Sequence, residues 1–152
     1  ALHFACDNGH GDVVKQLLAA GASMKLQNEN GVNPIYLACI RGHYELVLKY
    51  MDEGEDYNSQ NKGGHDLLHV ASTKCHEAIL KRILQSGANV AIQTNHGMTP
   101  LHLAAEHDQH DVAVKILLDA NAPIDMTNNA GKTPLHIATF FRNTRTVIRL
   151  LN

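Results

Sequence analysis

The chain has 152 residues, and its 13 Lys and Arg against 15 Asp and Glu give a formal net charge of −2. Because the charge is near balance and the basic residues are scattered, the composition does not indicate a nucleic-acid-binding protein. The longest apolar run, Pro34 to Ile40, is far too short to cross a bilayer, and no charged-then-apolar leader opens the chain. We therefore expect an intracellular, cytoplasmic protein without membrane insertion in this segment.

One short pattern returns five times along the chain, at intervals of 33, 33, 33 and 34 residues. Its copies begin at Ala1, Pro34, Leu67, Pro100 and Pro134. Internal repeats of this period indicate a linear array in which each unit contacts mainly its neighbours. We predict one domain over residues 1–152, whose first and last units are incomplete. The predicted units are about 1–32, 33–65, 66–98, 99–132 and 133–152.

Each unit is predicted to form two short antiparallel helices. In the first helix, an apolar residue faces the neighbouring units, and an alanine three residues later lets helices approach closely. In the second helix, two apolar residues follow each other at helical spacing and join the core. In chain order, the members of these four repeat positions are Leu2, Ile35, Leu68, Leu101 and Leu135; Ala5, Ala38, Ala71, Ala104 and Ala138; Val14, Val47, Leu80, Val114 and Val147; and Leu17, Tyr50, Ile83, Leu117 and Leu150.

The residues at the helix ends match known capping chemistry. Proline suits the first helical turn because its missing N–H would have no partner there, and the preceding Thr99 or Thr133 can cap the helix. Asn33 and Asp66 can replace that threonine. Left-handed helix ends are predicted at Gly21, Gly54, Gly87 and Asn121.

The period and the Thr-Pro-Leu-His-x-Ala pattern resemble the ankyrin repeat. A Gly-His pair, a Gly-Ala close and a glycine before the next unit also recur in phase. The resemblance implies an all-α repeat solenoid of helix-turn-helix units, with β-hairpin-like fingers rich in Asn and Gly. It also implies a concave face, formed by the fingers and the first helices, that binds a protein partner without catalysis or a cofactor.

Two units depart from the pattern. In the third unit, Asp66 and Leu67 replace Thr-Pro, and Cys75 replaces a loop glycine, so we expect this unit to fray first. The fourth unit holds one extra residue within 107–110, between its two helices.

The repeat accounts for the positions of Cys6, Cys39 and most of the histidines. Cys6 and Cys39 occupy the same repeat position one unit apart, and stacked helices lie roughly 10 Å from each other. This separation is beyond the reach of a disulfide, so we expect reduced thiols. Eight of the 11 histidines occupy two recurring positions, and we interpret them as structural: His3, His69, His102 and His136; and His10, His43, His76 and His110.

Pairs of histidines at helical spacing raise the question of a metal site. His65 precedes His69 by four residues, and His107 precedes His110 by three. Zinc requires three or four ligands and no Cys pair completes either set, so we predict no metal. Cys75 and His76 are adjacent, an arrangement that does not aim a nucleophile at its base, and we predict no catalytic residue.

Partner contacts are expected at repeat positions that the fold does not dictate. By resemblance, these are the finger tips and the exposed end of each first helix, where apolar residues and Arg41 would be binding hot spots. For Phe140 and Phe141, the alternative is packing against a further unit. The predicted partner-binding residues are Ile40, Arg41, Lys62, His65, Lys74, His96, Met98, Glu106, His107, Lys132, Phe140 and Phe141.

Two alternative functions stay open at this point. The array could be a targeting or regulatory region of a larger enzyme or membrane protein, because the sequence starts inside a helix and stops before a closing Gly-Ala. We therefore expect further repeats or domains in the full protein. The array could also be the substrate of an asparagine hydroxylase, since Asn58 occupies the position that is modified in some ankyrin proteins.

Overall fold

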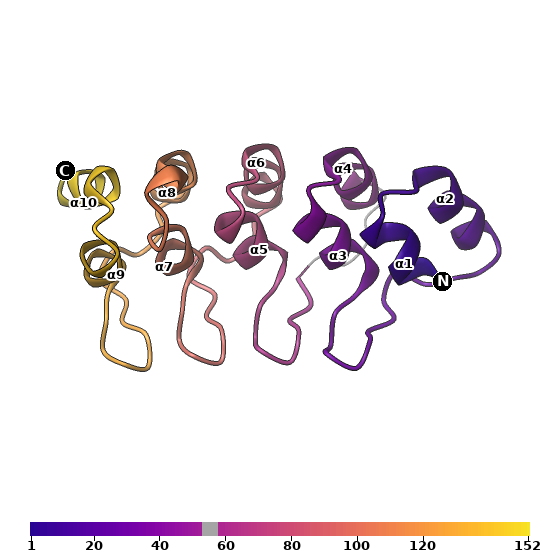
Figure 1. The fold of residues 1–152 in the computed structure, drawn as a ribbon, viewed down its shortest axis with the longest axis horizontal. Coiled ribbons are helices and arrows are strands. Elements are labelled where there is room, and N and C mark those ends of the chain that lie inside the picture. The colour runs from indigo at the N-terminus through magenta and orange to yellow at the C-terminus, as the bar shows by residue number, and fades with distance from the viewer. Residues whose placement is uncertain (53–57) are drawn as a thin grey trace.

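The computed structural model describes residues 1–52 and 58–152, without the side chain of Asp108. Paired helices follow one another along a single row, with the two termini at opposite ends (Figure 1). In chain order, the helices are α1 (Leu2–Asp7), α2 (Gly11–Ala19), α3 (Pro34–Arg41), α4 (Tyr44–Asp52), α5 (Leu67–Thr73), α6 (Glu77–Gln85), α7 (Pro100–Ala104), the 3₁₀ helix η1 (Asp108–His110), α8 (Asp111–Asp119), α9 (Pro134–Phe140) and α10 (Thr144–Leu151).

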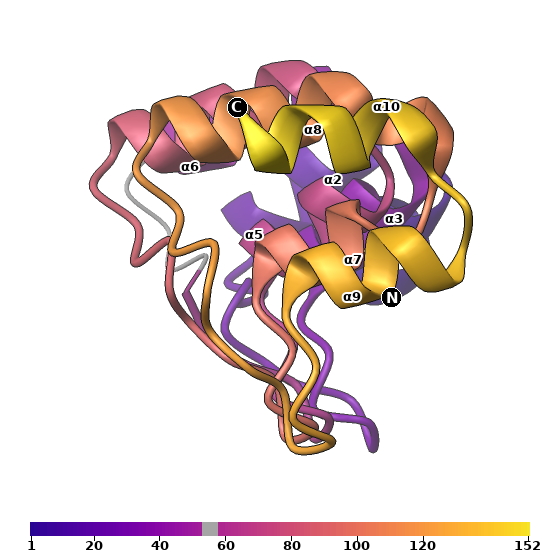
Figure 2. The same cartoon turned by 90° about the vertical axis from the view of Figure 1, so that its left-hand side faces the viewer.

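The helices form two layers. The odd-numbered α-helices lie side by side in one layer and the even-numbered helices in the other (Figures 1 and 2). Contacts run from α1 through α3, α5 and α7 to α9, and each odd helix also packs on the following even one. The predicted all-α repeat architecture is confirmed. Among the described residues, no helix is both long enough and apolar enough to span a membrane.

Loops that connect one helix pair to the next project away from both layers (Figure 1). Each loop closes with a turn, as where the Asn28 N–H donates to the Val32 carbonyl at 2.9 Å. Neighbouring loops are also joined, since the Lys62 N–H donates to the Asn30 carbonyl at 3.1 Å. The structure assigns no strand to the residues that it describes, so the β-hairpin-like form of the fingers stays a prediction.

The core lies between the layers and between successive units. All five alanines of the first helices are buried, as are Leu2, Ile35, Leu68 and Leu101 at the neighbouring repeat position. In the second helices the predicted core residues are also buried, except that Leu17 and Val147 are half-buried. Leu135 is half-buried because the structure has no helix pair beyond the last unit to cover it.

The predicted helix ends are confirmed where the structure describes them. Thr99 and Thr133 each accept a hydrogen bond from the backbone N–H three residues later, and Asn33 and Asp66 do the same. Asn121 adopts a left-handed backbone with φ +60°, as do Gly21 and Gly87. Gly54 lies outside the described residues. Cys75, which replaces a loop glycine, has φ +53°.

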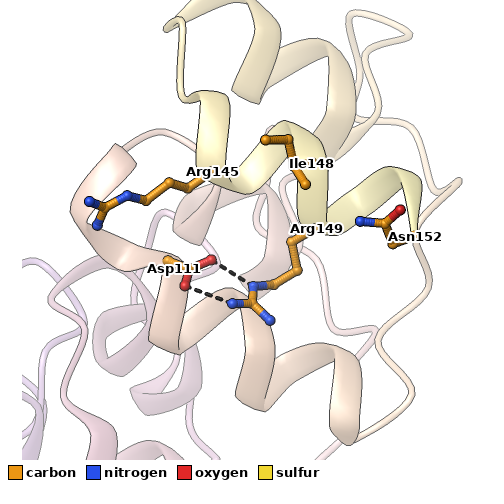
Figure 3. A pocket seen from close by; sticks show the side chains of 5 residues that line it. All are labelled: Asp111, Arg145, Ile148, Arg149 and Asn152. Carbon is orange, nitrogen blue, oxygen red and sulfur yellow. Dashed lines mark hydrogen bonds and ion pairs between the residues drawn. The ribbon is translucent and has the colours of Figure 1, made fainter.

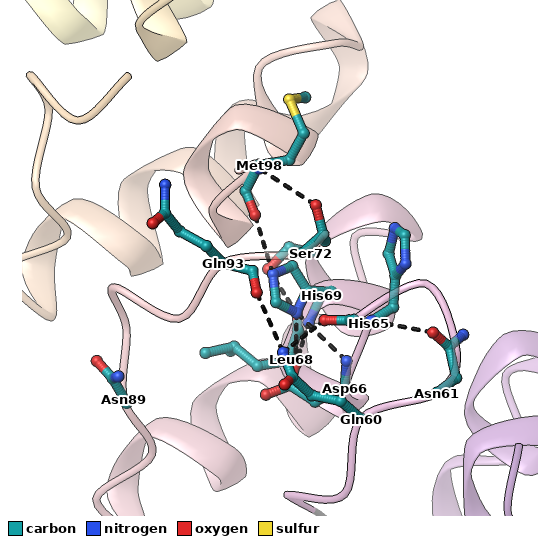
Figure 4. A network of polar contacts seen from close by, with 12 residues as sticks. Gln60, Asn61, His65, Asp66, Leu68, His69, Ser72, Asn89, Gln93 and Met98 are labelled. Carbon is teal, nitrogen blue, oxygen red and sulfur yellow. Dashed lines mark hydrogen bonds and ion pairs between the residues drawn. The ribbon is translucent and has the colours of Figure 1, made fainter. Parts of the chain in front are cut away.

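The histidines of the Thr-Pro-Leu-His motif connect successive units. His102 Nδ1 lies 2.8 Å from Thr99 Oγ1, while its Nε2 lies 2.9 Å from the Lys132 carbonyl of the next unit. His69 makes the equivalent contact with the Met98 carbonyl at 3.2 Å (Figure 4). The sequence indicated a structural role for these rings but did not predict the bond to the following unit.

All three cysteines are free. Cys6 and Cys39 are fully buried, and burial raises the pKa of their thiols to about 11 and about 12, respectively. The reduced state of these thiols stays a prediction.

Candidate functional site

A row of exposed side chains runs along the C-terminal ends of the odd-numbered helices. We call it the helix-end row; it consists of Asn8, Arg41, Lys74, His107 and Phe141. These residues share one repeat position, and each is exposed, including those in units with a neighbour on both sides. Their exposure is therefore a property of the fold and does not depend on a unit's place in the row.

The repeat position just before this row behaves differently. Asp7, Ile40, Thr73 and Glu106 are half-buried there, whereas Phe140 of the last unit is 79% exposed. Ile40 packs against the core, which accounts for its apolar character. Phe140 is exposed because no described unit covers it.

The two adjacent phenylalanines therefore have different surroundings, although their rings meet edge-on at 5.2 Å. Phe140 lines a hollow of 670 Å³ at the end of the row, together with Lys132, Leu135 and His136. Phe141 instead lines a hollow of 400 Å³ with Glu106, His107 and His110 of the preceding unit. Phe141 therefore lies beside the preceding unit, whereas Phe140 lies at the end of the row.

The loops contribute a second set of predicted contacts. Lys62, His96 and Lys132 are exposed, whereas His65 and Met98 are half-buried. The sulfur of Met98 accepts a hydrogen bond from Asn128 Nδ2 at 3.2 Å, so its packing explains it without a partner. The His65 ring lies 5.6 Å from the His69 ring (Figure 4), and burial lowers the pKa of His65.

Charges on this surface are unequally paired. Arg41 Nε lies 2.8 Å from Asp7 Oδ1, and this contact lowers the pKa of the Asp7 carboxyl. Glu106 is half-buried, and burial raises the pKa of its carboxyl. Lys62 and Lys74 form no ion pair with any side chain that the structure describes.

A histidine pair lies beside Phe141. The rings of His107 and His110 are 4.7 Å apart, and burial is the main cause that lowers the pKa of His110. Among the side chains that the structure describes, which do not include that of Asp108, no three His, Cys, Asp or Glu are arranged to hold a metal ion.

The outer layer has its own hollow, between α8 and α10 (Figure 3). A bidentate ion pair between Arg149 and Asp111 occupies it. The distances are 2.6 Å from Arg149 Nε to Asp111 Oδ1 and 2.7 Å from Arg149 Nη2 to Asp111 Oδ2. Because the two charged side chains pair with each other, we interpret this hollow as the place of an ion pair that joins α8 and α10, and not as a binding site.

The modification candidate Asn58 is exposed, directly after the residues that the structure does not describe. Exposure is necessary for enzymatic hydroxylation but does not distinguish this residue from other surface asparagines. Its modification stays a prediction.

Two comparisons with known proteins complete this description. No curated protein matches the chain. The family model described as ankyrin repeats (3 copies) matches residues 2–94 and 79–152, which together cover nearly the whole sequence. The chain therefore belongs to the ankyrin repeat family.

Proposed function

We propose that this array is a non-catalytic scaffold that binds a protein partner along a concave face formed by the helix-end row and the loops. Ankyrin repeats generally serve as protein–protein interaction modules, and such domains are typically non-catalytic. In this proposal, the loops act as hairpin-like fingers beside the odd-numbered helices. Hydrogen bonds between neighbouring loops would keep that face rigid, so we expect little backbone change on binding.

The observation that carries the proposal is the position of Phe141. Its repeat position is exposed in all five units and is polar in the other four. Phe141 is 49% exposed, and since the other four units carry polar residues at this position, folding does not require an aromatic side chain there. Covering an exposed phenylalanine contributes up to about 1.5–3 kcal/mol, and aromatic residues are enriched among binding hot spots.

Separate substitution of the two phenylalanines tests this proposal. Peptides selected from a random display library on the intact protein serve as probes, and binding is measured against Phe141→Ala and, as the matched control, Phe140→Ala. We expect Phe141→Ala to weaken binding more than Phe140→Ala, with little change in melting temperature. Equal binding by both variants, or a loss of stability alone, would contradict the proposed site.

We also propose an intracellular, cytoplasmic location. All three thiols are free, and thiols are kept reduced in the cytosol. Fractionation of cells that express the full-length protein would test this location.

A further inference from the structure

One carboxyl beside Phe141 is half-buried and has no partner of opposite charge. It belongs to Glu106, which forms no ion pair with any side chain that the structure describes. The other described acids that are buried or half-buried each have a basic side chain at 2.8 Å or less. These pairs are Asp7 with Arg41, Asp66 with His69, and Asp111 with Arg149. Glu106 is therefore the exception among the described acids that the fold covers.

Partial burial makes the Glu106 carboxyl a place where a cation would be stabilised. Burial raises the pKa of Glu106, because the charged form is poorly solvated there, and the nearby His107 opposes that shift. No lysine or arginine among the described residues contributes to the shift. Moving a charge out of water costs free energy unless an opposite charge accompanies it, so a cation bound beside Glu106 would offset this cost.

The same two repeat positions show elsewhere in the chain how such a carboxyl can be paired. Asp7 occupies the repeat position of Glu106, and Arg41 occupies that of Phe141. Between the first and second units, Arg41 Nε lies 2.8 Å from Asp7 Oδ1, and Arg41 Nη2 lies 3.3 Å from Asp7 Oδ2. Between the fourth and fifth units the acid is present, but a phenylalanine stands in place of the arginine. The fifth unit therefore supplies no guanidinium at this position.

The hollow of 400 Å³ beside Glu106 is lined by residues of both units, and Phe141 is one of them. An arginine guanidinium is planar, binds a carboxylate through two parallel N–H bonds, and stacks on aromatic faces. A lysine ammonium is a compact point charge without that planar geometry. We propose that this hollow binds an arginine side chain of the protein partner, with the guanidinium paired to Glu106 and stacked on Phe141; this inference rests on the proposed scaffold function.

Titration of the isotope-labelled protein, followed by NMR, tests the inference. The probe is N-acetyl-arginine-N-methylamide, and its citrulline counterpart serves as an uncharged probe of similar shape. The lysine counterpart carries the charge without the guanidinium. Changes in the backbone amide signals locate the bound probe and give its dissociation constant.

Three variants separate the two groups that would hold the guanidinium. Glu106→Gln removes the charge, Phe141→Leu removes the aromatic face, and Phe141→Arg supplies an internal guanidinium, as Arg41 does for Asp7. The matched control is Asp7→Asn, because this acid has the same repeat position but is already paired. Circular dichroism establishes that each variant is folded.

We expect the arginine probe to shift the amide signals of residues 105–110 and 141–143, and to bind more tightly than the lysine probe. The citrulline probe should not bind. Glu106→Gln should weaken binding of the arginine probe about tenfold, Phe141→Leu should weaken it less, and Phe141→Arg should abolish it. Asp7→Asn should leave binding unchanged.

Several results would overturn the inference. The citrulline probe could bind as tightly as the arginine probe, or Asp7→Asn could lose as much binding as Glu106→Gln. Unchanged binding in Glu106→Gln or in Phe141→Arg would also show that the site is wrong. Equal binding of the arginine and lysine probes, with signals shifted around exposed acids throughout the protein, would replace the site by a general attraction of cations.

Peptides from the random display library separate this inference from the scaffold function. If selected peptides depend on Phe141 but share no arginine, the arginine site is wrong and the scaffold function stands. If no selected peptide depends on Phe141, the scaffold site is wrong and this inference falls with it. Peptides that share an arginine and require both Phe141 and Glu106 support both.

Discussion

Replacing His102 with leucine should weaken the attachment of the fourth unit to the fifth. The ring is fully buried, and its Nε2 lies 2.9 Å from the Lys132 carbonyl of the next unit. His136 occupies the same repeat position one unit later, but its ring is exposed and no described residue accepts from or donates to its Nε2. His136→Leu is therefore a matched control.

The difference between the two variants isolates the bond between units. Both rings cap their own helix with the same geometry, because Nδ1 lies 2.8 Å from the threonine hydroxyl in each case. Leucine removes that cap from both proteins, whereas only His102→Leu also loses the bond to the Lys132 carbonyl, which still accepts from the Asn128 N–H at 2.9 Å. A hydrogen bond within a protein contributes about 0.5–1.5 kcal/mol net, so His102→Leu should be less stable than His136→Leu by roughly that amount.

Urea denaturation followed by circular dichroism measures this difference, as the free energy of unfolding extrapolated to water. If both variants lose the same stability, the bond between units contributes nothing measurable. A larger loss in His136→Leu would show that the local cap outweighs contact between units, contrary to this reasoning.

Three further predictions concern stability. Ala104→Leu should destabilise the protein by roughly 1–3 kcal/mol through overpacking, because Ala104 is fully buried; unchanged urea stability would show that this position tolerates a larger residue. Cys75→Gly should stabilise it by about 1 kcal/mol, since the left-handed backbone at φ +53° strains residues with a Cβ; a lower melting temperature would contradict this expectation. Burial lowers the pKa of His76, His102 and His110, so the unfolded chain takes up more protons, and stability should be fully present above about pH 6.5 and fall as the pH drops below it. Urea denaturation at a series of pH values, all above the range in which carboxylates titrate, measures this loss, and a constant free energy of unfolding would refute it.

Much of the fold could be predicted because its determinants are local or strictly periodic. The caps at Asn33 and Asp66 depend on bonds to a backbone N–H three residues away. The left-handed conformations at Asn121 and Cys75 follow from the glycines at the same repeat positions elsewhere. The buried alanines were predictable because alanine recurs at the same repeat position in all five units, and each copy has a similar environment.

The candidate site could be predicted only as a set of repeat positions. Ile40 and Met98 were expected on the solvated surface, but both are half-buried, because packing by the neighbouring unit decides how much of each position is covered. Phe140 and Phe141 are adjacent in sequence, and only the structure separates the one at the end of the row from the one beside the preceding unit.

The sequence by itself determined the period, the helix pairs, their caps and the residues that could not be exposed. The tertiary structure decided which of the remaining side chains are free to meet a partner. Arg41 is neutralised by Asp7, which lies 34 residues away, whereas Lys62 and Lys74 find no acid among the described side chains. Such pairings form between side chains of different units, so they depend on how neighbouring units stack and not on the pattern within any one of them.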